Sequence, residues 1–173
     1  MAKVTGALFS LEASGKFANA LVFDRRGYVR GYKRPTNPQT APQGNVRQVM
    51  LAAQRALGVA GDVTKTGIKE LAPVDYRWNS YLIQQLIGKG SVEWDASLAA
   101  FNALDPADQT AWTDEADTLG VPEISIPYAG DPPIPAGAAL FALSRTLYHL
   151  GIHAATGAPD GTNAAAWATI IAS

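Results

Sequence analysis

The chain has two histidines, His149 and His153, four residues apart near the end of a predicted helix. This spacing can bring two imidazole rings to one metal ion. However, no Glu lies between them to act as a base, Gly151 interrupts the helical turn, and the sequence offers no obvious third ligand. Histidines also favour the negative end of a helix dipole. We therefore predict two ordinary helix-end histidines and no bound metal.

Several carboxylates lie close together, and such pairs serve acid–base catalysis when a cleft separates their pKa values. In this sequence they fall on the polar sides of predicted helices or in first helical turns, where acidic groups favour the helix dipole. Solvated faces and helix caps therefore explain them better than a catalytic pair. The groups are Glu93 with Asp95, Asp105 with Asp108, and Asp114 with Glu115 and Asp117.

Motifs for nucleophilic catalysis and phosphate binding are missing from the sequence. It has no G-x-S-x-G elbow, and Ser14-Gly15-Lys16 lacks the preceding glycine of a phosphate loop. Cysteine is absent, which excludes disulfides, thiolate catalysis and metal sites built on Cys. We predict a protein that is not an enzyme, with no catalytic residue, no cofactor and no small-molecule substrate. A hydrolase that uses Asp114 and Glu115 is the alternative of this class.

Residues 25–34 are the best candidate for contact with a non-protein ligand. In an extended strand, Tyr28, Arg30, Tyr32 and Arg34 share one face, so aromatic rings alternate with cations. Proteins that bind single-stranded nucleic acid use this arrangement for stacking and phosphate contact. The same face would equally suit an acidic protein surface. The predicted contacts to an anion or an acidic partner are Arg25, Arg26, Lys33 and Arg34.

The sequence before residue 35 has the pattern of strands and turns. Glycine recurs too often across residues 3–34 for a helix interior, and the apolar run 17–23 is short and bounded by turn signals. Residues 24–27 fit a hairpin loop that leads into a returning strand over residues 28–34. A hairpin with two apolar faces needs cover on both sides. We expect a neighbouring subunit to provide one cover, by contact with Phe17, Leu21, Val22, Phe23, Tyr28, Arg30 and Tyr32.

Three prolines make residues 35–43 a stiff, extended connector, and helical periodicity begins near residue 43. The first helix is predicted to bury Val46, Val49, Met50, Ala53 and Leu57 and to turn Arg47, Gln48, Gln54 and Arg55 outward. A second helix is predicted over residues 73–87, with an apolar stripe of Val74, Trp78, Tyr81, Leu82 and Leu86. Glycines end both helices.

Further helices follow in the second half of the chain. One carries the stripe Trp94, Leu98 and Phe101, and the next begins with Asp105 as N-cap and Pro106 in its first turn. Five prolines make residues 120–135 a long irregular loop. The last two helices are predicted over residues 135–150 and 162–171; the final one presents Ala164, Trp167 and Ile171.

The charges are sorted along the 173 residues. Residues 1–60 contain nine Lys/Arg against two acidic residues, a net charge of +7, and residues 61–173 contain five against thirteen, a net charge of −8. The two halves either fold against each other within one subunit or meet head to tail between subunits. With 47% apolar residues the chain can bury a core, and no apolar run approaches the length of roughly 18–20 residues that a membrane helix needs.

Two separated blocks of the sequence form a pattern of motifs in a fixed order. The first contains Gly15-Lys16-Phe17, Val22-Phe23, Gly27-Tyr28-Val29-Arg30, Tyr32, Pro35 and Asn37-Pro38-Gln39-Thr40, followed by Gln43 and Arg47. The second contains Phe101, Leu104, Asp108-Gln109, Ala111-Trp112, Ala116, Gly137, Leu140-Phe141, Leu147, Gly151 and Ala158-Pro159. Together the blocks resemble small proteins encoded among the virion genes of tailed phages and prophages. The resemblance implies a structural protein of the virion without catalytic residues. It does not distinguish capsid, neck and tail.

These observations give one leading hypothesis. The expected fold class is α+β and predominantly α, with an N-terminal β-hairpin arm (1–34), a proline-rich connector (35–43), and a bundle of five or six helices (44–173) that includes the loop 120–135. The expected function is assembly, by strand pairing and apolar packing, with copies of itself and with capsid, neck or tail proteins. The expected location is the virion, assembled in the host cytoplasm, without membrane contact. A nucleic-acid-binding accessory protein is the alternative.

Overall fold

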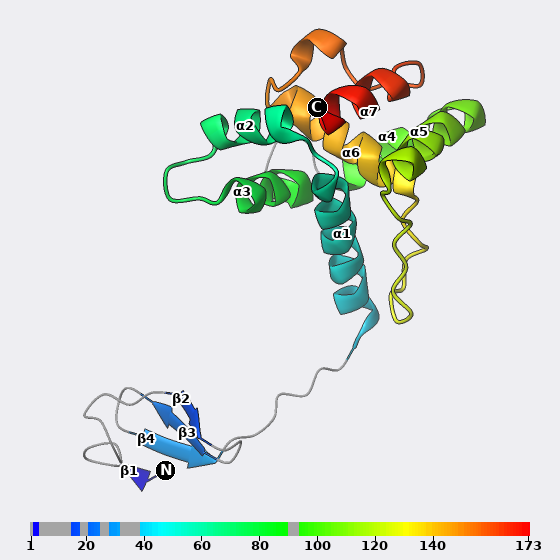
Figure 1. The fold of residues 1–173 in the computed structure, drawn as a ribbon. Helices are drawn as coiled ribbons and strands as arrows, with labels where there is room; N and C mark the ends of the chain where they lie inside the picture. Colours follow the sequence, from blue (N-terminus) through cyan, green and yellow to red (C-terminus); the bar gives the residue numbers. More distant parts are fainter. Residues whose placement is uncertain (1, 4–14, 18–20, 25–27, 32–38, 90–93) are drawn as a thin grey trace. The chain divides into compact units, whose positions relative to one another are not determined.

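The computed structural model describes residues 2–3, 15–17, 21–24, 28–31, 39–89 and 94–173 (Figure 1). The chain divides into two compact units, residues 1–38 and residues 39–173. The first unit contains short strands and the second contains helices. Each unit is therefore described by itself.

Four short strands form an antiparallel sheet in the N-terminal unit. They are β1 (Ala2–Lys3), β2 (Gly15–Phe17), β3 (Leu21–Asp24) and β4 (Tyr28–Gly31), in the spatial order β1-β4-β3-β2. The predicted strand over residues 17–23 is not continuous, because Phe17 pairs with Leu21 in the neighbouring strand. Of the predicted hairpin loop 24–27, Asp24 ends β3. Residues 25–27 of that loop and residues 32–34 of the returning strand lie outside the described residues.

Seven α-helices make up the described part of the second unit. They are α1 (Ala41–Gly58), α2 (Asp62–Leu71), α3 (Trp78–Gln84), α4 (Trp94–Asn102), α5 (Pro106–Leu119), α6 (Ala136–His149) and α7 (Ala164–Ala172). A π-helical turn, η1 (Gln85–Lys89), continues α3, and a 3-10 turn, η2 (Ala154–Thr156), precedes α7.

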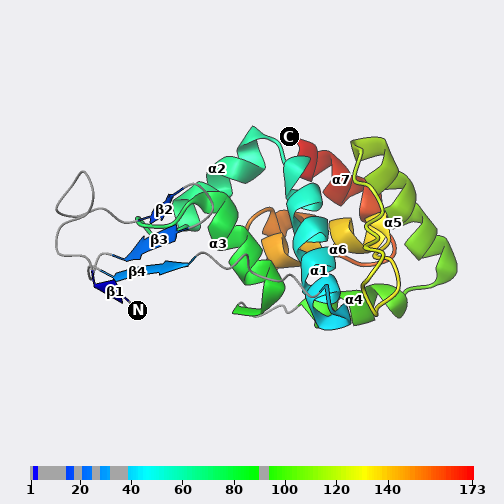
Figure 2. The ribbon, with the colours of Figure 1, turned by 90° about the horizontal axis from the view of Figure 1, so that it is seen from below.

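Helix α6 lies at the centre of this unit, in contact with α1, α4, α5 and α7 (Figure 2). Every residue from Ala136 to Ser144 is buried, because the other helices cover all sides of α6. The ring of Phe141 packs edge-on against Trp112 at a centroid distance of 5.1 Å and against Phe101 at 5.9 Å. These aromatic contacts join α4, α5 and α6 in one core.

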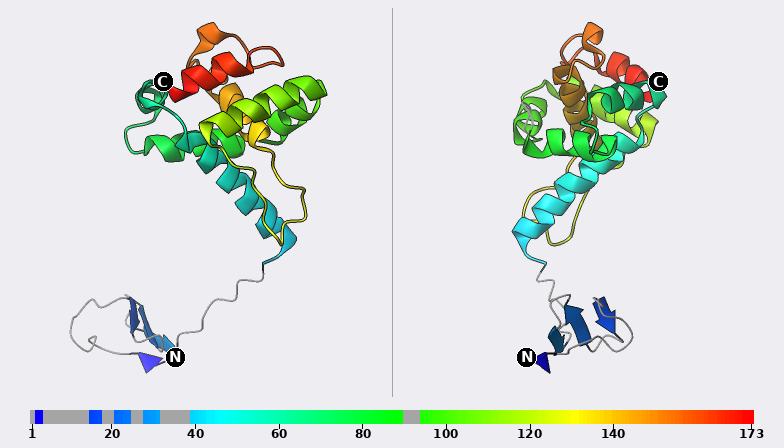
Figure 3. Two further views of the ribbon diagram at one scale, coloured as in Figure 1. Left: turned by 45° about the vertical axis from the view of Figure 1, so that its right-hand side comes forward. Right: turned by 90° about the vertical axis from the view of Figure 1, so that its left-hand side faces the viewer.

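Polar side chains hold the loop 120–135 against α1, and Figure 3 shows the loop running alongside this helix. The Asn45 Oδ1 atom accepts bonds from the Gly130 and Asp131 amides at 2.8 and 3.2 Å. The Gln48 amide donates to the Pro132 carbonyl at 2.7 Å, and Arg47 bonds to the Tyr128 hydroxyl. The loop is irregular, as predicted, and its residues 128–132 are held against α1 by these hydrogen bonds.

The predicted fold class, α+β with a bundle of five or six helices, is wrong. The described residues of the second unit contain seven α-helices, and the strand-like pairing found among them is a single bridge between Ile124 and Ile134. The additional helix is α2, which the sequence pattern does not predict. Its apolar residues are sparse, and its buried Thr64 gains hydrogen bonds only through tertiary contacts.

Two predicted apolar stripes are also partly wrong. Val46 of α1 is 64% exposed, whereas Gln48 on the predicted outer face is 1% exposed, so the buried face of α1 is rotated. Helix α3 begins at Trp78 rather than near residue 73, and Val74 is fully exposed before it. The predicted helices α4 to α7 are confirmed, and the predicted boundaries of α5 to α7 agree within two residues.

The close packing of α5 against α6 gives a test of this core. An added Cβ at Gly137 would lie 2.7 Å from the Thr113 Oγ1 atom and 2.8 Å from its backbone nitrogen. We expect Gly137→Ala to lower the free energy of unfolding by about 1–3 kcal/mol, since the helices must move apart. Gly58→Ala, which meets no heavy atom within 4 Å, should raise it by up to about 1 kcal/mol through helix propensity. Urea unfolding of both variants measures the difference, and equal stability would contradict the packing.

Candidate functional site

The residues predicted to form the subunit interface lie in three strands of the N-terminal unit. The register places Phe17 opposite Leu21, Val22 opposite Arg30, and Phe23 opposite Val29. Tyr28 begins β4, opposite Asp24. Tyr32 and the predicted anion contacts Arg25, Arg26, Lys33 and Arg34 lie outside the described residues. The sheet thus brings the described interface residues together on neighbouring strands.

The carboxylates considered for catalysis lie on α5 or at the start of helices. Asp114 and Asp117 are exposed on α5, and Glu115 is half-buried there. Asp105 precedes α5 and Asp108 lies in its first turn, while Glu93 lies outside the described residues. No group of three or more metal-ligating side chains occurs in the described part of the chain.

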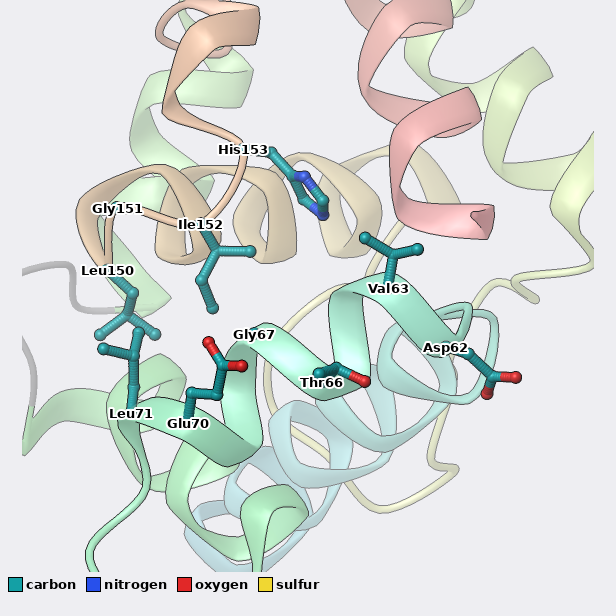
Figure 4. Close-up of a pocket in the computed structure, with 10 residues that line it drawn as sticks. All are labelled: Asp62, Val63, Thr66, Gly67, Glu70, Leu71, Leu150, Gly151, Ile152 and His153. Carbon is teal, nitrogen blue, oxygen red and sulfur yellow. The ribbon is translucent and has the colours of Figure 1, made fainter.

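The structure shows a groove between α2 and the segment that follows α6 (Figure 4). We call it the α2 groove; its volume is about 640 Å³. One wall consists of α2 residues and the other of residues 150–153. The lining residues are Asp62, Val63, Thr66, Gly67, Glu70, Leu71, Leu150, Gly151, Ile152 and His153.

The wall that follows α6 is shaped by a Schellman motif. Gly151 takes a left-handed conformation (φ +77°), its amide donates to the Tyr148 carbonyl at 2.9 Å, and the Ile152 amide donates to the Leu147 carbonyl at 2.9 Å. Glycine adopts this conformation without steric strain. The motif turns the chain back, so that the Ile152 side chain points toward Gly67 of α2 (Figure 4).

Buried hydrogen bonds of Thr64 hold the two walls of the groove in place. The Thr64 hydroxyl lies 3.2 Å from the Ile171 carbonyl and 3.3 Å from the Ile170 carbonyl of α7, and 3.0 Å from Nε2 of His153. The hydroxyl has one proton, and the His153 tautomer decides whether it donates to these carbonyls or to Nε2 of His153. This network joins α2, α7 and the residue 150–153 wall.

His153 has an unusual backbone conformation, and its partial burial favours a neutral ring. Its backbone is left-handed (φ +58°), which few residue types other than Gly, Asn, Asp and His adopt readily. Burial removes water from the imidazole and lowers the pKa of His153 below its ordinary value of 6.5. His149 lies on the exposed end of α6 and takes no part in this network. The predicted absence of a shared metal site for these two histidines stays a prediction.

The chemistry of the α2 groove suits binding rather than catalysis. Thr64 and His153 have the separation of a nucleophile and its base, but the Thr64 side chain is fully buried. A substrate in the groove would not reach that hydroxyl. What the groove presents to solvent is apolar surface between two exposed carboxylates, Asp62 and Glu70.

A second groove lies between α1, η1 and α4. Its volume is about 500 Å³, and the exposed side chains of Val46 and Ile87 border it. Asp95 and Asp131 provide its charges. The further lining residues are Asn45, Val49, Met50 and Trp94. Like the α2 groove, it combines apolar side chains with carboxylates.

One local signal for the α2 groove was present in the sequence. The order Leu147, Tyr148, Gly151, Ile152 is typical of a helix that ends in a Schellman motif with an apolar residue after the glycine. We interpreted Gly151 only as an interruption between two histidines. The opposite wall could not be found in this way, because α2 itself was not predicted.

Comparisons with protein-family models, with curated proteins and with solved structures find no match to this chain. None of the helices in the described ranges is both long and apolar enough to cross a bilayer.

The lowered pKa of His153 predicts a pH dependence of stability. Between the folded-state pKa and about 6.5, the unfolded state binds more protons than the folded state, so the free energy of unfolding falls as the pH decreases through this window. Above about pH 6.5 the ring is neutral in both states and the effect vanishes. Urea unfolding midpoints measured across the window should show this slope.

The variant His153→Asn removes the titrating ring, and Asn tolerates the left-handed backbone. We expect the slope in this window to become smaller in the variant. His149→Asn, which changes a histidine outside the network, is the matched control. An unchanged slope in His153→Asn would show that the ring is not the group responsible.

Proposed function

We propose that this chain is a non-enzymatic structural subunit of a tailed-phage particle. It assembles with copies of itself and with capsid, neck or tail proteins, through strand pairing by its N-terminal unit and apolar packing by its helical unit. The observation that carries the proposal is the division of the chain into two units of opposite net charge. The resemblance of residues 15–47 and 101–159 to phage virion proteins supports the location in the virion.

The two units carry opposite net charges, although the basic stretch continues past the unit boundary as far as Arg55. Residues 1–38 contain seven Lys/Arg against two acidic residues, a net charge of +5, and residues 39–173 contain seven against thirteen, a net charge of −6. Like charges within one unit repel, whereas unlike units of two copies attract. Such complementarity raises association rates and fixes the orientation of docking partners.

Surface features of both units support assembly. The spatial order of the strands leaves β1 and β2 with a partner on one side each, and such edges can accept a strand from another chain. In the helical unit, Val46, Val63 and Leu71 are large apolar residues that border grooves and are 64%, 57% and 45% exposed. Apolar surface around a groove is typical of interaction sites.

Deletion of residues 1–34 tests this function. The helical unit keeps its own core, so the truncated protein should remain folded, with an unchanged helical signal per residue and cooperative unfolding. It should no longer enter particles, because the strands are missing. Immunogold labelling of particles from infections with full-length or truncated protein measures incorporation. Normal incorporation of the truncated protein would remove the N-terminal unit from the mechanism, and absence of the full-length protein from particles would refute the proposed function.

A nucleic-acid-binding accessory protein is the second candidate, favoured by the net charge of +5 in the N-terminal unit. Binding would use Arg25, Arg26, Arg30, Lys33 and Arg34. If these five cations each neutralised one phosphate, the binding constant for single-stranded nucleic acid would fall roughly a hundredfold for a fourfold rise in salt, because counterions are released. Fluorescence anisotropy with a labelled oligonucleotide measures this slope. A flat salt response or no binding in low salt would exclude this candidate.

A further inference from the structure

Apolar side chains border the α2 groove on both walls. Val63 and Leu71 lie at opposite ends of α2, eight positions apart, which is about 12 Å along a helix axis. Leu150 and Ile152 form the facing wall. Single exposed apolar residues are ordinary on protein surfaces, but here the exposed Val63 and Leu71 border one groove of about 640 Å³ together with the half-buried Leu150 and the buried Ile152. This groove has room for several side chains of a partner.

Gly67 at the floor of the groove is not required by packing. A Cβ at this position would lie 3.4–3.8 Å from the Ile152 side chain, which is ordinary van der Waals contact. Glycine inside a helix costs about 1 kcal/mol relative to alanine. The residue thus lowers the stability of α2 and leaves the groove deeper. A glycine that helix stability and packing do not explain is consistent with space kept for an occupant.

The charges that line the groove indicate which charge a bound segment should carry. Asp62 and Glu70 are both exposed and lie eight positions apart on α2, and no Lys or Arg lines the groove. Lys65 approaches Asp62 at 3.9 Å, but an exposed pair of this kind is weak and exchanges readily. An apolar segment that carries cations therefore complements the groove. One wall is helix α2 and the other is a capped turn, so a partner binds through side-chain contacts rather than by adding a strand to a sheet.

The chain itself contains a segment with these properties. Residues 25–34 combine five cations with Tyr28, Val29 and Tyr32. They belong to the unit of net charge +5, whereas the groove belongs to the unit of net charge −6. We propose that the α2 groove binds the basic segment 25–34 of a second copy of this chain. This inference rests on the proposed function, because it names the partner through which the subunits associate.

An exchange of charges between two variants tests the proposal. In the full chain, Asp62→Lys with Glu70→Lys makes the groove basic. The combined changes Arg25→Glu, Arg26→Glu, Lys33→Glu and Arg34→Glu leave one cation against four carboxylates, so they make the segment 25–34 acidic. Each variant alone should self-associate at least about tenfold more weakly than the unchanged protein, since like charges now meet. A mixture of the two should associate again, because each segment then faces a groove of opposite charge. Sedimentation velocity measures association, and a fluorescent label on one variant identifies mixed complexes.

The matched control is Asp114→Lys with Asp117→Lys, which changes the net charge of the helical unit equally but lies on the exposed face of α5. This control should associate like the unchanged protein. The proposal is overturned if the unchanged protein is a monomer at all concentrations, if the groove variant associates normally, or if mixing restores nothing. Restored association only with a capsid or tail protein would identify a different occupant and also overturn it.

Gly67→Ala provides a second test that does not depend on charge. The variant should unfold at a higher urea concentration, because alanine favours the helix. It should nevertheless self-associate several-fold more weakly, since the methyl group fills the floor of the groove. Higher stability with unchanged association would contradict the assignment of the groove.

Particle labelling separates this inference from the proposed function. If the groove variant is incorporated normally into particles while its self-association is unchanged, the inference fails and the structural role stands. If the unchanged protein is absent from particles, the structural role fails whatever the self-association experiment shows. If the groove variant loses both self-association and incorporation while the α5 control variant keeps both, the result supports the inference and the proposed function.

Discussion

The burial of α6 from Ala136 to Ser144 is the constraint on which the helical unit depends. A helix covered on all sides has to be apolar around its whole circumference, and Ala136–Phe141 provides this with small residues, Leu140 and Phe141. The hydroxyls of Ser144 and Thr146 would be costly there. They donate instead to the carbonyls of Leu140 and Ala142, both at 2.9 Å, within the helix itself. The other helices can therefore pack on α6 without supplying polar partners.

The sequence predicted those helices whose apolar stripe and end signals lie within the helical segment itself. For α5, the pair Asp105-Pro106 marks the start, and Trp112 and Ala116 define the buried face. Which face of α1 is buried could not be predicted. The buried Gln48 donates a hydrogen bond to the carbonyl of Pro132, which lies 84 residues later in the chain. Helix α2 was missed for a similar reason, since Thr64 is satisfied by α7, more than a hundred residues away. Tertiary partners outweighed the local apolar pattern in both helices.

The same distinction applies to the candidate site. One wall of the α2 groove follows from a local motif, the glycine turn at residues 150–153, and the sequence contained its signal. The groove also depends on the approach of Ile152 to Gly67 of α2, and no local sequence pattern predicts that contact. The predicted interface residues lie in the N-terminal unit, whereas the groove lies in the helical unit. Sequence reasoning thus identified a candidate segment but not a surface to receive it.

The proposed contact combines two effects that act differently. Exposed charge pairs contribute about 0–1 kcal/mol each, so the carboxylates of Asp62 and Glu70 mainly orient an incoming segment and favour a basic one. Apolar contacts along Val63, Leu71 and Ile152 contribute in proportion to the area that they bury. Neither effect predicts tight pairing of two free copies. In a particle, however, each subunit has several neighbours at once, and linked weak contacts reach a combined affinity that no single contact has. A shallow, charged groove is therefore sufficient for a subunit that works in an assembly, and it leaves the isolated chains free to exchange partners before assembly is complete.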